Sequence, residues 1–309
     1  MPQPSAQTAS DTNKVYLLGP EGTFSDAAAR IYVEHLTAAG LPHPVVVHTK
    51  SIEKALADAA ADTAAVAIVP IENSETGTVI VTQEELRGLP LNIEWELSIP
   101  VRYSLISRAP LERITRILCH PLAYGQCSRF LNQHVGDAEV SFVSSNARAG
   151  VELEALDESV PAAALVPTEY ATAGRWSTAV KNVQNSAFNT TRFLVMRRRE
   201  LSRPLDFSRR KTSAAIKPKE DRPGVLSDLL AAFGKRSINI TRIESRPSRE
   251  RVWNYVFFLD FNNNAGVPDA LREVALHAEQ VIILGTYDSL APVANESGVD
   301  ALAGDVGDA

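Results

Sequence analysis

The sequence predicts an α/β protein of two facing lobes, followed by a smaller unit of four strands and two helices. Up to about residue 183, short apolar runs alternate with helical patterns, which is typical of parallel sheets covered on both faces. A basic segment at 197–211 then interrupts the pattern, and the order beyond it becomes strand, helix, strand, strand, helix, strand. At 309 residues the chain lies at the upper limit for one hydrophobic core, so about two domains are expected.

The first lobe begins with a βαβαβ pattern. Residues 14–20 (KVYLLGP) form an apolar run that ends at Gly-Pro, as a buried strand entering a turn does. Ser25 is a credible N-cap for the following helix, and Gly40 ends the apolar periodicity. The other elements expected here are a strand at 45–48, a helix capped by Ser51 and a buried strand at 64–70.

The second lobe continues the alternation after a less regular stretch. Its expected elements are strands at 98–107 and 114–119, a helix at 125–134, a strand at 139–143, a helix opened by residues 144–146 and a strand at 162–166. Two such runs, divided near residue 98, suggest two lobes that face each other. Ligands of open α/β sheets bind outside the carboxyl ends of the strands, so a cleft between the lobes is the expected site.

The C-terminal unit has the strand and helix order of a ferredoxin-like fold. Its expected elements are strands at 213–217, 238–245, 252–261 and 281–287 and helices at 224–236 and 268–277. One face of the third strand is wholly apolar and is expected to be buried; its residues are Trp253, Tyr255, Phe257, Leu259 and Phe261. The basic segment before this unit is interpreted as a solvated linker, and the acidic tail beyond the unit is expected to be disordered.

Composition excludes several classes of protein. The 31 Lys and Arg against 37 Asp and Glu give a net charge of −6, which offers no general attraction for nucleic acid or anionic lipid. No apolar run approaches the roughly 20 residues that span a bilayer, and residues 1–13 lack the pattern of a signal peptide, so a cytoplasmic protein is expected. Two cysteines, Cys119 and Cys127, and six scattered histidines predict reduced core thiols and no metal site.

Four loops of small polar residues fall at the carboxyl ends of predicted strands or at the helix starts that follow them. They are 19–25 (GPEGTFS), 70–74 (PIENS), 125–126 and 144–146. Backbone N–H groups at helix starts, helped by hydroxyls and amides, bind carboxylates, so the loops favour a small anionic ligand. Helix capping alone would also explain any one of them.

A fifth candidate is the strand pattern at 189–195 (NTTRFLV), which is expected to run back to the first lobe. In an extended strand Thr191 and Phe193 share one face and Arg192 points to the other, so Thr191 and Arg192 both face the cleft only if the backbone bends. The sequence has no motif for covalent, metal or redox chemistry, and His120 before Pro121 is expected to be a satisfied structural residue. The candidate functional groups are therefore hydroxyls, amides and helix ends, which can stabilise an anion or donate a proton to a leaving group.

Five segments in this order resemble the prephenate dehydratase family with a C-terminal ACT regulatory domain: GPEGTFS at 19–25, PIENS at 70–74, HPLAYGQC at 120–127, TRFLV at 191–195 and TRIESRP at 241–247. The resemblance covers about residues 14–287. It implies a bilobed catalytic domain at 14–196 like the type II periplasmic binding proteins, a basic linker at 197–211 and an ACT domain at 212–287. A disordered leader at 1–13 and an acidic tail at 288–309 would flank them.

The family reaction converts prephenate to phenylpyruvate, water and carbon dioxide without a cofactor, as a step of L-phenylalanine biosynthesis. By resemblance Thr191 donates a proton or hydrogen bond to the departing hydroxyl. The residues implied to bind substrate are Thr23, Asn73, Ser74, Gln126, Ser145, Arg192 and Phe193. An arogenate dehydratase, a decarboxylase that does not aromatise its substrate and a non-catalytic amino-acid sensor are the alternative readings.

The resemblance also implies regulation by L-phenylalanine at an interface between two ACT domains. The residues implied to bind the effector are Gly224, Val225, Leu226, Asn239, Glu244 and Ser245. Pairing of two such units would cover their open sheet edges, so a homo-oligomer, dimer or tetramer, is expected.

Overall fold

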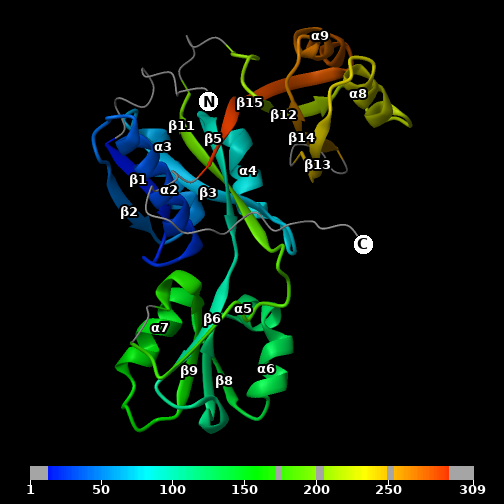
Figure 1. The fold of residues 1–309 in the computed structure, drawn as a ribbon. Coiled ribbons are helices and arrows are strands. Elements are labelled where there is room, and N and C mark those ends of the chain that lie inside the picture. Colours follow the sequence, from blue (N-terminus) through cyan, green and yellow to red (C-terminus); the bar gives the residue numbers. More distant parts are fainter. Residues whose placement is uncertain (1–12, 172–174, 200–204, 249–253, 292–309) are drawn as a thin grey trace, which may run out of the picture.

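The computed structural model describes residues 13–171, 175–199, 205–248 and 254–291. Figure 1 shows two lobes stacked one above the other, with a third unit beside the first lobe. The strands form one ten-stranded sheet, shared by the first lobe and the C-terminal unit, and one five-stranded sheet in the second lobe. Among the described residues, no helix combines the length and apolar character needed to cross a membrane.

The first lobe is a sheet in the order β5-β11-β3-β1-β2, with helices on both faces. Its elements are β1 (Lys14–Leu18), α2 (Phe24–Ala38), β2 (Val45–Thr49), α3 (Ile52–Ala61), β3 (Ala65–Asn73), β4 (Gly77–Thr78), α4 (Ile80–Gly88), β5 (Leu91–Pro100) and β11 (Thr190–Arg198). The apolar residues of β3 are almost fully buried, because α2 covers one face of the sheet and α3 and α4 cover the other. As expected, β11 returns from the second lobe and lies antiparallel between β3 and β5.

The second lobe is a sheet in the order β10-β6-β9-β7-β8. Its elements are β6 (Tyr103–Ser107), η1 (Leu111–Arg113), β7 (Arg116–Cys119), α5 (Pro121–Gln126), α6 (Ser128–His134), β8 (Glu139–Phe142), α7 (Asn146–Ala155), β9 (Ala162–Pro167), η2 (Thr168–Tyr170) and β10 (Thr178–Lys181). The chain enters this lobe after β5 and leaves it before β11, so two connections join the lobes (Figure 1).

Several predicted boundaries were wrong. The single strand expected at 98–107 is two strands, because the chain leaves the first sheet after Pro100 and joins the second at Tyr103. Helix α4 lies in the stretch that looked irregular, and α5 begins four residues earlier than Gly125. Ser25 is not an N-cap: α2 begins at Phe24, after Thr23, and Ser25 is buried inside the helix.

The C-terminal unit has the predicted βαββαβ order. It consists of β12 (Lys211–Pro218), α8 (Val225–Gly234), β13 (Ile240–Pro247), β14 (Tyr255–Asn262), α9 (Val267–His277) and β15 (Ala278–Leu290). The strand order β13-β14-β12-β15 is that of a ferredoxin-like fold.

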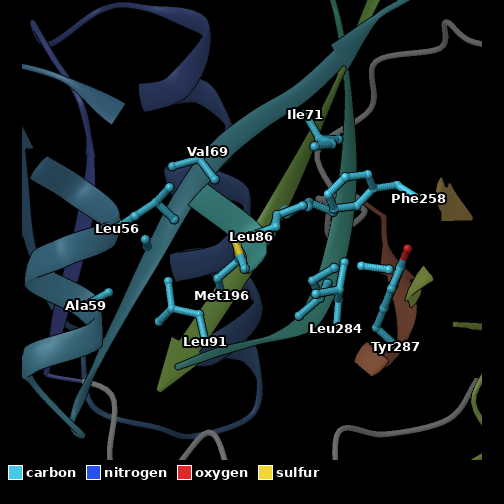
Figure 2. Close-up of a cluster of buried hydrophobic side chains, with 14 of the residues drawn as sticks. Leu56, Ala59, Val69, Ile71, Leu86, Leu91, Met196, Phe258, Leu284 and Tyr287 are labelled. Atoms are coloured by element: carbon cyan, nitrogen blue, oxygen red, sulfur yellow. The ribbon is translucent and has the colours of Figure 1, made fainter. Parts of the chain in front are cut away.

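On β14, Phe257, Leu259 and Phe261 pack beneath α8 and α9, as their alternation predicts. Tyr255 is exposed, and Trp253 lies outside the described residues. The opposite face of β14 is also covered: Val256 and Phe258 belong to the core of the first lobe. Figure 2 shows Phe258 in one cluster with Leu86 of α4 and Tyr287 of β15.

Strand β15 joins the C-terminal unit to the first lobe. Beyond its pairing with β12 it runs parallel to β5, with Asp288 opposite Trp95 and Leu290 opposite Leu97. Leu290 is buried in the first-lobe core. The expectation of a disordered tail is therefore wrong for residues 288–290, and the tail beyond 291 lies outside the described residues.

The basic segment before β12 was expected to be a solvated linker; Arg198 and Arg210 are exposed, but two other arginines of the segment are paired inside the fold. Arg197 is 6% exposed and pairs with Glu94 at 3.2 Å. Arg209 lies over the ring of Trp95, at 4.6 Å from the centroid, and pairs with Asp288. Arg209 therefore links β15 of the C-terminal unit to β5, whereas Arg197 joins β11 to β5 within the first lobe.

Candidate active site between the lobes

The two lobes touch where the loop before α2 meets the second lobe. Phe24 packs edge-on against Tyr103, with ring centroids 5.6 Å apart. Gly22, which has a positive φ of 81°, lies against Ala147 and Tyr170, and a Cβ at this position would come within 3.5 Å of the Ala147 side chain. The loops that the sequence marked on the two lobes are therefore neighbours in space.

Thr191 and Asn73 lie opposite each other at the ends of β11 and β3. The side-chain Nδ2 of Asn73 donates to Thr191 Oγ1 at 3.0 Å and to Asn189 Oδ1 at 2.7 Å. The Oδ1 of Asn73 accepts from the backbone N–H groups of Glu75 and Thr76, each at 3.0 Å. Because the Asn73 amide is held on both sides, it fixes the position of the Thr191 hydroxyl.

Glu75 lies near both this pair and Cys127 of the second lobe. Asn189, which is fully buried, donates through Nδ2 to Glu75 Oε2 at 3.3 Å. Burial raises the pKa of the Cys127 thiol to about 12, and the nearby Cys119 and Glu75 add to this effect. Burial also raises the pKa of Cys119 to about 11. Both cysteines are free and buried, as expected, and such thiols are poor nucleophiles.

Three buried polar atoms around the same contact have no hydrogen-bond partner: Thr23 Oγ1, Gln126 Oε1 and Asn146 Oδ1. The amide nitrogen of Asn146 donates to the Tyr103 hydroxyl at 3.3 Å, and Tyr103 in turn packs on Phe24, next to Thr23. Buried polar atoms in folded proteins almost always have a partner. An unpartnered set of this kind is suited to hydrogen bonding with a polar ligand.

The two predicted serines make structural hydrogen bonds. Ser74 Oγ donates to the carbonyl of Phe188 at 3.1 Å and accepts from the N–H of Thr190 at 3.0 Å, which ties β3 to the start of β11. Ser145 is the N-cap of α7 and accepts from the N–H of Arg148 at 3.1 Å. His120 likewise caps α5 through Nδ1, so the prediction of a structural histidine is confirmed.

The structure does not bring Arg192 and Phe193 to this contact between the lobes. Phe193 is 2% exposed and lies in the first-lobe core. A register shift separates Arg192 from Phe193 in the pairing with β3, yet Arg192 still points away from Thr191. Its guanidinium lies 3.2 Å from Glu72 and 3.3 Å from Glu96 and also pairs with Asp260. In the structure the Arg192 guanidinium is thus engaged by three carboxylates on the face opposite Thr191.

Four residues of the site were missed in the sequence: Glu75, Tyr103, Asn146 and Asn189. Asn146 and Asn189 belong to segments that the sequence did mark, and their short polar side chains next to the expected residues were the available signal. Glu75 directly follows the marked segment 70–74 and meets Asn189 beside the pairing of β3 with β11. Tyr103 gave no such signal, because only the approach of the two lobes brings it to the site.

The predicted effector residues do not converge within one chain. Gly224, with a positive φ of 84°, precedes Val225 and Leu226 in the first turn of α8. Asn239 lies at the other end of the sheet, where its carbonyl accepts from Asn262. Glu244 faces the first lobe and accepts from Thr78 Oγ1 at 2.9 Å.

Two concavities lie outside the contact between the lobes. A cavity of about 50 Å³ is lined by Val225, Tyr255 and Phe257 among others, next to the start of α8. A groove of about 900 Å³ runs beside α2 and β2 and includes the His48–Asp26 pair at 3.0 Å. This larger groove shares no residue with the site around Thr191. No cluster of three or more potential metal-binding side chains occurs in the described part of the chain.

Comparison with known proteins shows two family matches along the chain. The prephenate dehydratase family model matches residues 15–201, and the ACT domain model matches residues 220–275. A prephenate dehydratase of Amycolatopsis methanolica is 32% identical over 279 residues, which cover 89% of this chain and 88% of the relative. The enzyme of Methanocaldococcus jannaschii is 30% identical over 88% of this chain and 97% of its own length.

A solved structure supports the same assignment. The crystal structure of prephenate dehydratase from Arthrobacter aurescens in complex with L-Phe has a TM-score of 0.75 and 28% identity, over 91% of this chain and 92% of that one. The family model covers more than half of the residues, and the relatives align along nearly the whole chain. The chain belongs to the prephenate dehydratase family and carries an ACT domain at its C-terminus.

Proposed function

We propose that the protein dehydrates and decarboxylates prephenate to phenylpyruvate, with Thr191 as the residue that assists the departing hydroxyl. Family membership supports the reaction, and the hydrogen bond from Asn73 to Thr191 is the observation that supports the role of this threonine. Because Asn73 donates to Oγ1, the hydroxyl hydrogen of Thr191 is left to donate to a ligand. The Thr191 hydroxyl then faces the leaving group as a donor.

The reaction requires one proton from outside the substrate. As the bond to the carboxylate breaks, carbon dioxide departs and its bonding electrons complete the aromatic ring. The ring carbon–oxygen bond breaks at the opposite carbon, and the hydroxyl leaves as water once it has received a proton. Threonine is a weak acid, so its contribution is a hydrogen bond or late proton transfer of the size usual for general acids, about 10²–10⁴-fold, and solvent restores the proton.

Substrate binding is assigned to neutral donors and acceptors between the lobes. Thr23 and Gln126 each have a buried oxygen without a partner, and we add Asn146, which has one as well. Ser74 and Ser145 contribute through the backbone segments that they hold, since their hydroxyls already bond to the main chain. Positioning of the substrate by such groups reduces the entropy cost of reaching the transition state.

We further propose that L-phenylalanine binds between the ACT domains of two chains in a homo-oligomer. The crystal structure of the Arthrobacter aurescens prephenate dehydratase in complex with L-Phe supports the effector, and the scatter of the predicted effector residues within one chain supports the need for a second copy. Gly224, Val225 and Leu226 would come from one chain, and Asn239 and Ser245 from the other. Glu244 is assigned instead to the contact with the first lobe. We expect the protein to act in the cytoplasm.

The absorbance of phenylpyruvate in alkali, measured after incubation of the purified protein with prephenate, tests the proposed reaction. Phenylpyruvate formation above the spontaneous rate supports it. Turnover of arogenate to phenylalanine with little turnover of prephenate would instead identify an arogenate dehydratase. If neither substrate is consumed faster than in buffer while L-phenylalanine still binds, the protein is a sensor and the enzymatic proposal fails.

A further inference from the structure

Six charged side chains lie together between the first lobe and the ACT sheet, directly behind Thr191. We call them the junction cluster: Glu72 of β3, Glu96 of β5, Arg192 of β11, Lys211 of β12, Arg242 of β13 and Asp260 of β14. Three come from the catalytic domain and three from the ACT sheet, and their three positive and three negative charges balance. Five of the six side chains are 13% exposed or less, and Glu72 is 34% exposed.

Arg192 is the centre of the cluster. It pairs with Glu72 and Glu96 on the neighbouring strands of its own domain and with Asp260 across the junction. Burial alone would lower the pKa of Arg192, but the carboxylates of Asp260 and Glu72 outweigh this effect and hold it above its ordinary value. Asp260 is fixed in turn by Ser213, whose hydroxyl donates to its other oxygen. Asp260 therefore holds the Arg192 guanidinium from a rigid sheet.

A second link runs parallel to the first. Arg242 of β13 pairs through Nε with Glu72 at 2.8 Å and donates to Gln83 Oε1 of α4 at 2.6 Å. Glu72 thus binds an arginine of each domain, Arg192 on one oxygen and Arg242 on the other. The ACT sheet holds both members of the pair formed by Arg192 and Glu72.

That pair is adjacent to the catalytic pair in the same ladder. In the antiparallel pairing of β11 with β3, Thr191 lies opposite Asn73 and Arg192 lies opposite Glu72. Successive side chains of a strand point to opposite faces, so one pair faces the second lobe and the other faces the ACT sheet. The regular pairing of β11 with β3 ends just after Arg192, because the register shifts between Arg192 and Phe193. On that side the ladder does not hold Thr191 in a regular register. Displacement of Arg192 would therefore move Thr191 relative to the substrate.

Buried ion pairs add little net stability, because desolvation of the charges offsets their attraction, although removal of one partner is costly. A balanced cluster across a domain junction is better explained by the geometry that it imposes. We propose that Asp260 of the ACT domain is a positioning residue for the dehydration, acting through Arg192 on Thr191; this rests on the function proposed above.

The test uses the full chain with Asp260→Asn, which keeps the size of the side chain and an oxygen for Ser213 but removes the charge facing Arg192. We expect kcat to fall about tenfold or more while KM changes less than about threefold, because the substrate-binding residues on the second lobe are untouched. Glu84→Gln is the matched control, since it removes another carboxylate at the same junction, which pairs with Arg246 of β13 at 3.0 Å. Its kcat should equal that of the parent.

A double substitution separates positioning from general destabilisation. In a Thr191→Ala background Asp260→Asn should cost no further activity, because the hydroxyl that Asp260 positions is already gone. An equal fold-loss with and without Thr191 would overturn the proposal. So would an unchanged kcat of Asp260→Asn in a parent enzyme that turns over prephenate.

Hydrogen exchange keeps the proposal testable independently of activity. Asp260→Asn should accelerate amide exchange at the start of β11 by about tenfold, and Glu84→Gln should not. Equal exchange rates in the two variants would contradict the proposal, even if the protein does not act on prephenate. If Asp260→Asn fails to fold, the same rates and exchange are measured for Arg242→Lys, which disturbs the ion pair with Glu72. Lysine keeps the positive charge but lacks the planar guanidinium that reaches both Glu72 and Gln83.

Discussion

The amide nitrogen of Asn73 lies 3.0 Å from the hydroxyl oxygen of Thr191, although 118 residues separate them in the sequence. Asn73 is in turn held by the N–H groups of the turn that follows β3. The hydroxyl expected to assist the leaving group therefore has a fixed direction before any ligand binds. Such preorganisation reduces the reorganisation needed during the reaction.

Thr191→Ala should lower kcat about 100-fold or more without unfolding the protein, because it removes the assisting hydroxyl but leaves the β11 ladder intact. Thr191→Ser should retain more activity, since its hydroxyl survives with greater rotational freedom. Steady-state rates of phenylpyruvate formation, with circular dichroism as the check on folding, measure both variants. Equal rates for the alanine variant and the parent would contradict the assigned role.

Asn73→Asp should reduce kcat about tenfold to 100-fold while KM changes less. The aspartate keeps an acceptor for the N–H groups of Glu75 and Thr76 but presents a carboxylate to Thr191. The Thr191 hydroxyl would then donate to this carboxylate instead of to the substrate. A variant with parental kcat would show that Asn73 does not direct the hydroxyl.

Local patterns predicted most of the fold. The fully buried β3 was recognisable as an apolar run, and the βαββαβ order of the ACT domain followed from the alternation of strand and helix periods. Strand alternation also placed Arg192 on the face opposite Thr191, which the contacts of both side chains confirm. These features depend on the neighbours of each residue along the chain.

The sequence could not show what depends on contact between distant segments. The basic residues at 197–211 suggested a solvated linker. The partners of Arg197 and Arg209 could not be recognised, because Glu94, Trp95 and Asp288 come from β5 and β15, far away in the sequence. The role expected for Arg192 required a free guanidinium, and its carboxylate partners lie 68 or more residues away. A single sequence does not reveal which opposite charges meet inside a fold.

Gly224→Ala should weaken L-phenylalanine binding about fivefold or more. The positive φ of Gly224 is unfavourable for alanine, so the substitution would distort the start of α8. Gly40→Ala is a matched control, because Gly40 also has a positive φ and open space around it but lies at the end of α2. Titration calorimetry on both full-length variants makes the comparison, and equal affinities would remove the α8 start from the effector site.

Gly285→Ala should destabilise the junction between the ACT domain and the first lobe. A Cβ at this position would lie 2.4 Å from the carbonyl oxygen of Ile93 in β5, so one of the two strands must move. Overpacking of this kind costs about 1–3 kcal/mol in the free energy of unfolding. Gly234→Ala has open space, and should change stability by less than about 1 kcal/mol. Urea denaturation distinguishes the two, and equal midpoints would show that β15 does not press on β5.

Two histidines should make the protein less stable in mild acid. Burial lowers the pKa values of His35 and His120 below their usual value of 6.5. As the pH falls through 6.5, both histidines take up a proton in the unfolded chain but not yet in the folded protein. The unfolded state therefore binds more protons, and the free energy of unfolding decreases from about pH 7 until the lower, folded pKa values are reached.

His120→Asn isolates the contribution of the helix cap. Nδ1 of His120 accepts from the N–H of Leu122, which requires an unprotonated nitrogen, and asparagine offers an oxygen acceptor that does not titrate in this range. The variant should be about as stable as the parent at pH 7.5 and should lose less stability on acidification to pH 5.5. Urea denaturation at the two pH values gives the slope for each protein. A slope identical to that of the parent would mean that protonation of His120 does not oppose folding.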